Sequence, residues 1–222
     1  MFRFVLILAL ALSVTTARAD DHKLKTTKTA PKGLSPAITK LLAKEGFQIT
    51  GAKGAVVEVW LLNEVALKPG FKPGFTQMYP FSPGQLFGAL VIPKGVEYTD
   101  FKGQAMKPGT YTLRYGLQPM DGNHVGTSET YDFVLALPAK GDVKTDPIKS
   151  IEDLIKISAK AAGSAHPAIF SLLDPEEAEA KAKLVQDDFT EHWVLSFGAK
   201  GKAKDKKVDF KIRMVVVGQF EG

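Results

Sequence analysis

The sequence contains no cysteine among its 222 residues. This excludes disulfide bonds, thiol catalysis and a lipid anchor attached through an N-terminal cysteine. The fold must therefore be stabilised by an ordinary hydrophobic core. With 45% hydrophobic and 24% charged residues, the composition is that of a globular protein.

Long hydrophobic runs are also missing, apart from one short run near the N-terminus. Arg3 precedes an apolar stretch over residues 4–14, and Ala17 and Ala19 provide the small side chains of a cleavage site. This pattern predicts a signal peptide over residues 1–19 and export to the periplasm or the extracellular space. The run is shorter than the about 20 apolar residues that cross a bilayer, and no second run follows. We therefore expect no membrane span.

Charge of one sign is only in small excess, because the formal net charge is +5. Lysines concentrate in residues 22–33 and 199–207, and neither run alternates with the aromatic residues that stack on nucleic-acid bases. We interpret the first run as part of a flexible basic linker over residues 20–34 and the second as a solvated hairpin loop. No nucleic-acid partner is expected.

Familiar catalytic and cofactor motifs are absent as well. The chain contains no G-x-S-x-G, H-E-x-x-H, Walker A or G-x-G-x-x-G pattern. Enzymes built on serine or carboxylate residues stay open, since they need no such local pattern. The absences favour a protein that is not an enzyme and that has no cofactor.

Strand patterns dominate the middle of the chain, and turns rich in proline and glycine separate them. Within one of the runs, Tyr111, Leu113 and Tyr115 alternate with Thr112 and Arg114, which predicts a strand with one face on a core. The expected strands are residues 56–62, 85–92, 110–117 and 130–137, followed by a terminal hairpin formed by residues 192–199 and 207–220.

Three helices are expected from their start and stop signals. Ser35 and Pro36 begin the first helix, which should continue to the residue before Gly46. Ser150 begins the second and Gly163 ends it. Asp174 and the proline and glutamates that follow it begin the third. The last two helices would form an insertion over about residues 150–187.

Short strands with few helices predict a mainly β protein. We expect one domain over residues 35–222, an antiparallel β-sandwich of the jelly-roll or immunoglobulin-like kind with a few peripheral α-helices. A closed β-barrel is the main alternative.

Three segments of this β region, YPFSPGQLFGALVIP, DFKGQAMKPGTYTLRYGLQPMDGNH and DFVLALP, resemble a family of uncharacterised secreted bacterial proteins. The stretch AHPAIFSL at residues 165–172 is similar to another element of that family. The resemblance covers residues 58–172. It implies an exported domain and no particular activity.

The stretch QPMDGNH, which begins at Gln118, holds the densest group of polar side chains. Asp121, Asn123 and His124 can each bind a divalent metal, with a further ligand from His166, His192 or a distant carboxylate. The same residues are also typical of a turn, in which Gly122 would adopt positive φ. One histidine does not specify a zinc site, so both interpretations stay open.

A second candidate is the aromatic, Pro/Gly-rich segment over residues 60–81. Its rings could form a platform for a sugar or a peptide, or they could cover the core. The residues concerned are Trp60, Phe71, Phe75, Tyr79 and Phe81.

Three functions follow from these patterns. The first is an exported, non-catalytic binding or assembly module for a small ligand, a glycan or an envelope protein. The second is a metal-binding protein or metal-dependent hydrolase centred on Asp121 and His124, with His166 as a further ligand. The third is a structural protein of the cell envelope. The candidate ligand-binding residues are Trp60, Tyr79, Gln118, Asp121, Asn123 and His124.

Overall fold

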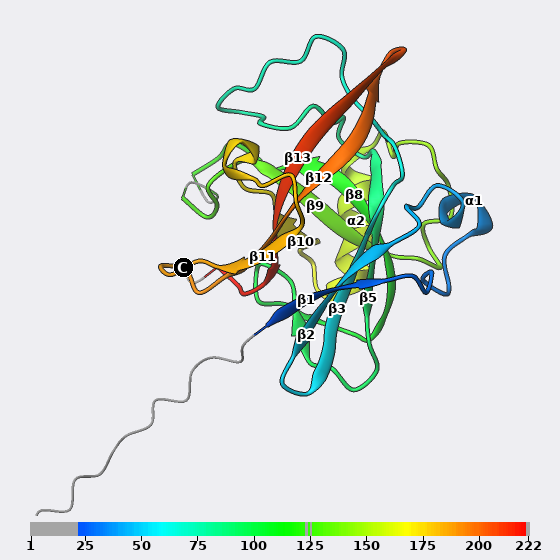
Figure 1. Ribbon diagram of the computed structural model, residues 1–222, viewed down its shortest axis with the longest axis vertical. Coiled ribbons are helices and arrows are strands. Elements are labelled where there is room, and N and C mark those ends of the chain that lie inside the picture. Colours follow the sequence, from blue (N-terminus) through cyan, green and yellow to red (C-terminus); the bar gives the residue numbers. More distant parts are fainter. Residues whose placement is uncertain (1–21, 123, 125, 221–222) are drawn as a thin grey trace, which may run out of the picture.

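The protein is described by a computed structural model that covers residues 22–122, 124 and 126–220 (Figure 1). The predicted signal peptide over residues 1–19 and the candidate Asn123 lie outside these described residues. The fold is mainly β and is built on two large sheets that pack on each other, so the predicted β-sandwich is confirmed.

Seven strands form the larger sheet, and every neighbouring pair in it is antiparallel. The four strands expected between residues 56 and 137 are all present. In spatial order the sheet contains β1 (Lys23–Thr27), β2 (Gly46–Gly51), β3 (Gly54–Leu61), β5 (Leu86–Ile92), β8 (Gly109–Leu117), β9 (Asp132–Pro138) and β10 (Ala168–Ser171).

The second sheet is built around the predicted terminal hairpin. Its strands continue much further than expected and leave only Lys204 and Asp205 as the turn, so residues 199–207 are mostly strand rather than a loop. The hairpin strands are β12 (Trp193–Ala203) and β13 (Lys206–Val217). Two further strands both pair with β12: β11 (Lys183–Gln186) near its start and the short parallel strand β4 (Val65–Ala66) near its end. A separate small pair is β6 (Tyr98–Thr99) with β7 (Ala105–Met106).

The core lies between the larger sheet and the hairpin, which crosses in front of it in Figure 1. The rings of Phe47 and Phe197, one from each sheet, have centroids 4.8 Å apart. The sheets also meet at one edge, where Leu172 and Met214 form a single bridge between the ends of β10 and β13. The ladder does not continue there, and the described strands do not close into a barrel.

The outer face of the larger sheet is covered by α2 (Ile151–Ala162). The predicted signals are confirmed: the Ser150 side chain accepts the Asp153 N–H, and Gly163 ends the helix in the left-handed region at φ 64°. Leu154 packs on Leu135 and Leu137 of β9. Within the described residues, no helix is both long and apolar enough to cross a membrane.

Arg114 also lies on this outer face, where it is fully buried. Its guanidinium donates to both carboxylate oxygens of Asp142, at 2.6 and 2.8 Å. The remaining N–H groups donate to the carbonyls of Gly84, Lys144 and Asp146. Arg114 therefore holds the segment after β9 against the outer face of the sheet. Both faces of β8 are buried, whereas the sequence pattern predicted burial of one face.

Two helix predictions are wrong in length. The helix that begins at Pro36 is the single turn α1 (Pro36–Thr39), and the one expected after Asp174 is the 3-10 turn η1 (Pro175–Glu177). Backbone bonds to neighbouring strands replace the helices: the Ala43 N–H donates to the Leu61 carbonyl, and the Ala180 carbonyl accepts the Gly198 N–H. These tertiary contacts override the local helix signals.

The predicted linker over residues 20–34 is also wrong in part, because β1 forms within it and pairs with β2 along all five of its residues. Leu24 packs against the core, while Lys23 and Lys25 are exposed. This alternation is what an edge strand requires, and edge strands commonly carry lysines.

Candidate functional site

An apolar cleft opens at one end of the core. At this end the β12–β13 hairpin extends beyond the larger sheet (Figure 1). Its volume is about 470 Å³, within the range of small-molecule sites in proteins. We call it the hairpin cleft. Its walls come from residues 67–80, from the far half of the hairpin, and from Pro175 and Glu176 of η1.

The hairpin wall is a continuation of the core face. In β12 and β13, Phe197 and Ile212 point into the core, and Ala203, Val208 and Phe210 follow on the same side because side chains alternate along a strand. Beyond the sheet, residues 67–80 and the start of η1 lie opposite this apolar side. Val208 is consequently 39% exposed at the cleft.

The opposite wall is tied to the hairpin through β4. The Leu67 N–H donates to the Lys202 carbonyl at 2.9 Å. Gly201 permits this approach, since a Cβ atom there would lie 2.6 Å from the Leu67 side chain. The distance between the two walls is thus set by backbone pairing.

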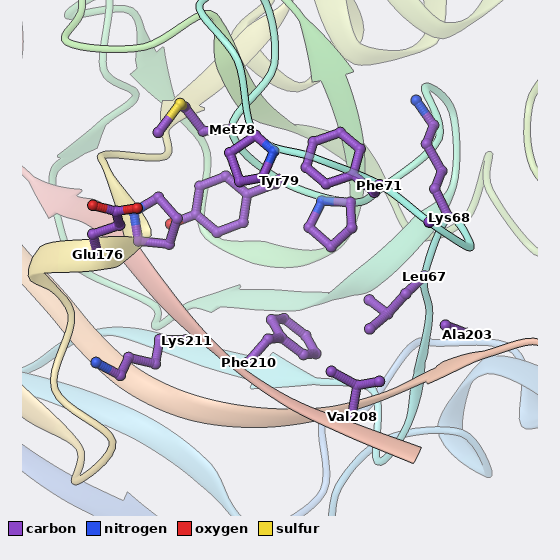
Figure 2. A pocket seen from close by; sticks show the side chains of 14 residues that line it. Leu67, Lys68, Phe71, Met78, Tyr79, Glu176, Ala203, Val208, Phe210 and Lys211 are labelled. Carbon is purple, nitrogen blue, oxygen red and sulfur yellow. The ribbon is translucent and has the colours of Figure 1, made fainter. Parts of the chain in front are cut away.

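Tyr79 forms the floor of the cleft and is fully buried (Figure 2). Its hydroxyl donates to the Leu173 carbonyl at 2.8 Å and accepts the Arg213 N–H at 3.0 Å. Burial raises the pKa of Tyr79 far above its ordinary value, so the phenol stays neutral. The floor therefore presents a ring rather than a reactive oxygen.

Asp132 holds this floor in place from β9. Its two carboxylate oxygens accept the backbone N–H groups of Met78 and Tyr79, at 2.8 and 3.1 Å, and one of them also accepts the Tyr115 hydroxyl. Burial raises the pKa of Asp132 against the opposing effect of these hydrogen bonds. All three donors belong to the fold, so Asp132 has a structural role.

Charged groups occur only at the rim. Figure 2 shows Lys211 and Glu176 at one end of the cleft and Lys68 at the other, with the rings of Phe71, Tyr79 and Phe210 between them. The Lys68 amine donates to the Gln77 side chain at 2.9 Å. The cleft thus combines apolar walls with two cations and one anion at its edge.

The predicted polar loop is separate from the hairpin cleft. Its residues bond to one another: Nδ1 of His124 lies 2.6 Å from Oδ1 of Asp121, and the Gln118 amide donates to the His124 carbonyl at 3.1 Å. The prediction that Gly122 has positive φ is wrong. The glycine with positive φ in this loop is Gly126, at φ 77°. The local hydrogen bonds are those of a closed turn.

The predicted metal ligands come only partly together. His124 contacts Asp121, whereas Nδ1 of His166 lies 2.9 Å from the Pro167 carbonyl oxygen and burial lowers the pKa of His166. Among the described residues, no three histidine or acidic side chains are grouped as a metal site requires. The metal site therefore stays a prediction.

The aromatic segment does not gather at one place. Phe71 and Tyr79 line the cleft, whereas Trp60 and Phe81 are buried elsewhere. Phe75 is 81% exposed and its ring contacts Tyr131. Trp60 lies on the outer face of the larger sheet, where a side chain on Gly46 would overlap its ring. Trp60 is thus not placed at the cleft.

Sequence reasoning missed the hairpin wall. The signal was present over residues 199–210, where Ala199, Gly201 and Ala203 alternate with lysines before Val208 and Phe210. Such alternation is typical of a ribbon with one apolar face. The high lysine content instead favoured a solvated loop.

Compared with known proteins, the chain matches no family model, no curated protein sequence and no solved structure.

Proposed function

We propose that this chain is an exported, non-catalytic binding module that holds a small amphiphile with one negative charge in the hairpin cleft. The observation that carries the proposal is the preformed apolar cleft with lysines at its rim. Export is the part of the proposal that rests on the predicted signal peptide and on the resemblance to secreted proteins.

The chemistry of the walls selects the ligand class. An aliphatic or aromatic body would displace water from the side chains of Leu67, Phe71 and Phe210, and burial of apolar surface contributes about 25 cal/mol per Å². A carboxylate, sulfate or phosphate head would remain at the rim beside Lys68 or Lys211. Glu176 at the same rim disfavours a second negative charge.

The polar groups beneath the cleft support binding rather than catalysis. Tyr79 and Asp132 already make hydrogen bonds within the fold, and the pKa of each is raised by burial. A general base has to reach its substrate with a free acceptor near neutral pH. Neither group meets this requirement.

The test uses two soluble probes on folded protein: 8-anilinonaphthalene-1-sulfonate is titrated by its fluorescence, and dodecanoate is titrated by its displacement of that fluorophore. Val208→Glu places a carboxylate in the cleft and should weaken binding of both probes by at least about tenfold, which corresponds to 1.4 kcal/mol. Val185→Glu is the matched control, because Val185 on β11 is 41% exposed and does not line the cleft. It should change affinity less than about twofold.

Thermal melts show whether both variants remain folded. Equal weakening in the two valine variants, or no saturable binding by wild type, would exclude the hairpin cleft as the ligand site.

A further inference from the structure

The far end of the hairpin is strongly basic. Residues 200–207, which we call the basic tip, contain five lysines and one aspartate, a net charge of +4. All five lysines are exposed, and in the described part of the chain no salt bridge joins any of them to a carboxylate. Figure 1 shows this tip projecting from the body of the molecule. Its charge is therefore open to solvent and to a partner.

The backbone concentrates this charge at some cost to stability. Lys202 and Lys207 lie directly opposite one another in the hairpin register, and like charges in that position are destabilising. Lys204 occupies the left-handed region at φ 54°, which glycine or asparagine adopts more easily. Without a ligand, the Lys202–Lys207 pair and the backbone of Lys204 only lower stability, whereas an anionic partner would offset the repulsion between the lysines.

We propose that the basic tip docks on the surface of a bilayer that contains anionic phospholipid. Each lysine near such a surface attracts its headgroups. The tip carries no aromatic ring for stacking on bases, which disfavours nucleic acid. On the other side of the same ribbon, Val208 and Phe210 face the hairpin cleft, so the charge of the lysines is what the tip offers to a bilayer.

This interaction goes beyond ligand binding in the cleft and does not require it. Docking would nevertheless bring the hairpin cleft to the membrane, because Ala203 belongs both to the tip and to the cleft wall. An amphiphile could then pass between bilayer and cleft over a short path.

The experiment measures co-sedimentation of the protein with vesicles of phosphatidylcholine, with and without phosphatidylglycerol. Wild type should bind only the anionic vesicles and should dissociate at high salt, because added salt shortens the range of charge attraction. The triple variant Lys202→Gln, Lys204→Gln, Lys207→Gln should bind about a hundredfold more weakly, since each lysine near the surface contributes about a factor of five.

A matched control changes the same charge elsewhere. Lys140, Lys144 and Lys149 are exposed on the segment that crosses the outer face of the larger sheet. Their triple Gln variant should bind anionic vesicles within about threefold of wild type. Equal losses in the two triples, or equal binding to neutral vesicles, would overturn the proposal. Binding of wild type to heparin but not to vesicles would also overturn it, and would assign the tip to a polysaccharide.

Failure of this proposal can be told apart from failure of the cleft. None of the three substituted tip lysines lines the cleft, so the tip triple should keep the wild-type titration with dodecanoate. Loss of vesicle binding with intact dodecanoate binding supports the tip as a separate surface. Loss of both in the tip triple refutes it.

Discussion

Replacing Arg114 by methionine should destabilise the protein by about 3–5 kcal/mol, the range for breaking a buried ion pair. The arginine is fully buried, and every one of its N–H groups has an acceptor. Methionine fills similar space but leaves the Asp142 carboxylate as an uncompensated buried charge. For a domain of this size, 1 kcal/mol corresponds to about 2–4 °C, so the melting temperature should fall by about 6–20 °C.

Two comparisons isolate the cause. Arg213→Met removes an arginine whose side chain is 15% exposed and whose partner Glu177 is 66% exposed, so its salt bridge should contribute about 1 kcal/mol or less. Arg114→Met combined with Asp142→Leu removes both charges. The double variant should be more stable than Arg114→Met alone, because apolar replacements of a buried pair are often neutral.

The assay is urea unfolding followed by circular dichroism for wild type, the single variants and the double variant. Additive losses in the Arg114 and Asp142 variants would refute the reasoning, since two groups in contact must show a coupling energy. A cost for Arg114→Met no larger than that for Arg213→Met would show that the segment after β9 is held by other contacts.

Four further outcomes are expected. Because the folded-state pKa of Asp132 is raised, the stabilisation linked to its proton is complete below the ordinary carboxyl range and is lost as pH rises. Wild type should therefore gain stability relative to Asp132→Asn as pH falls from 7 towards about 4, as measured by urea unfolding. A constant difference in stability between the two proteins would contradict the raised pKa. Gly126→Ala should cost about 1 kcal/mol, because Gly126 has positive φ, whereas Gly122→Ala should be nearly neutral in the same melts. His124→Ala should change stability by less than about 0.5 kcal/mol. If divalent ions raised the melting temperature of wild type but not of this variant, the result would support the predicted metal site. Deleting residues 20–32 should lower the melting temperature clearly, because β1 pairs with β2 and Leu24 packs against the core; an unchanged melt would show that β1 is dispensable.

The strands were predictable because their signals are local. Alternation over residues 110–117 and the turns around them depend on neighbouring residues alone, and β8 follows them. The helix α2 has its own cap at each end, at Ser150 and Gly163, and was found for the same reason. Burial of Arg114 was not predictable, since its five acceptors come from residues up to 32 positions away.

The candidate site was harder to predict than the fold. Tyr79 was a candidate and does line the hairpin cleft, but Phe210 and Val208 come from a hairpin more than a hundred residues later in the chain. Only the register of β12 with β13 and the pairing of β4 bring these segments together. The group at Gln118, Asp121 and His124 was prominent in the sequence because turn residues and ligand residues are chemically alike.

The position of the hairpin in the core has a consequence for how the chain folds. The inner face of the larger sheet, complete by β10, is covered mainly by Trp193–Val217. Since a ribosome delivers residues from the N-terminus onwards, most of the sheet emerges before its cover does. The apolar inner face of the sheet therefore stays exposed until the hairpin has been synthesised. Contacts between residues so distant in sequence also form slowly. The nascent chain should thus depend on chaperones until the hairpin emerges, and fragments that end before Trp193 should aggregate.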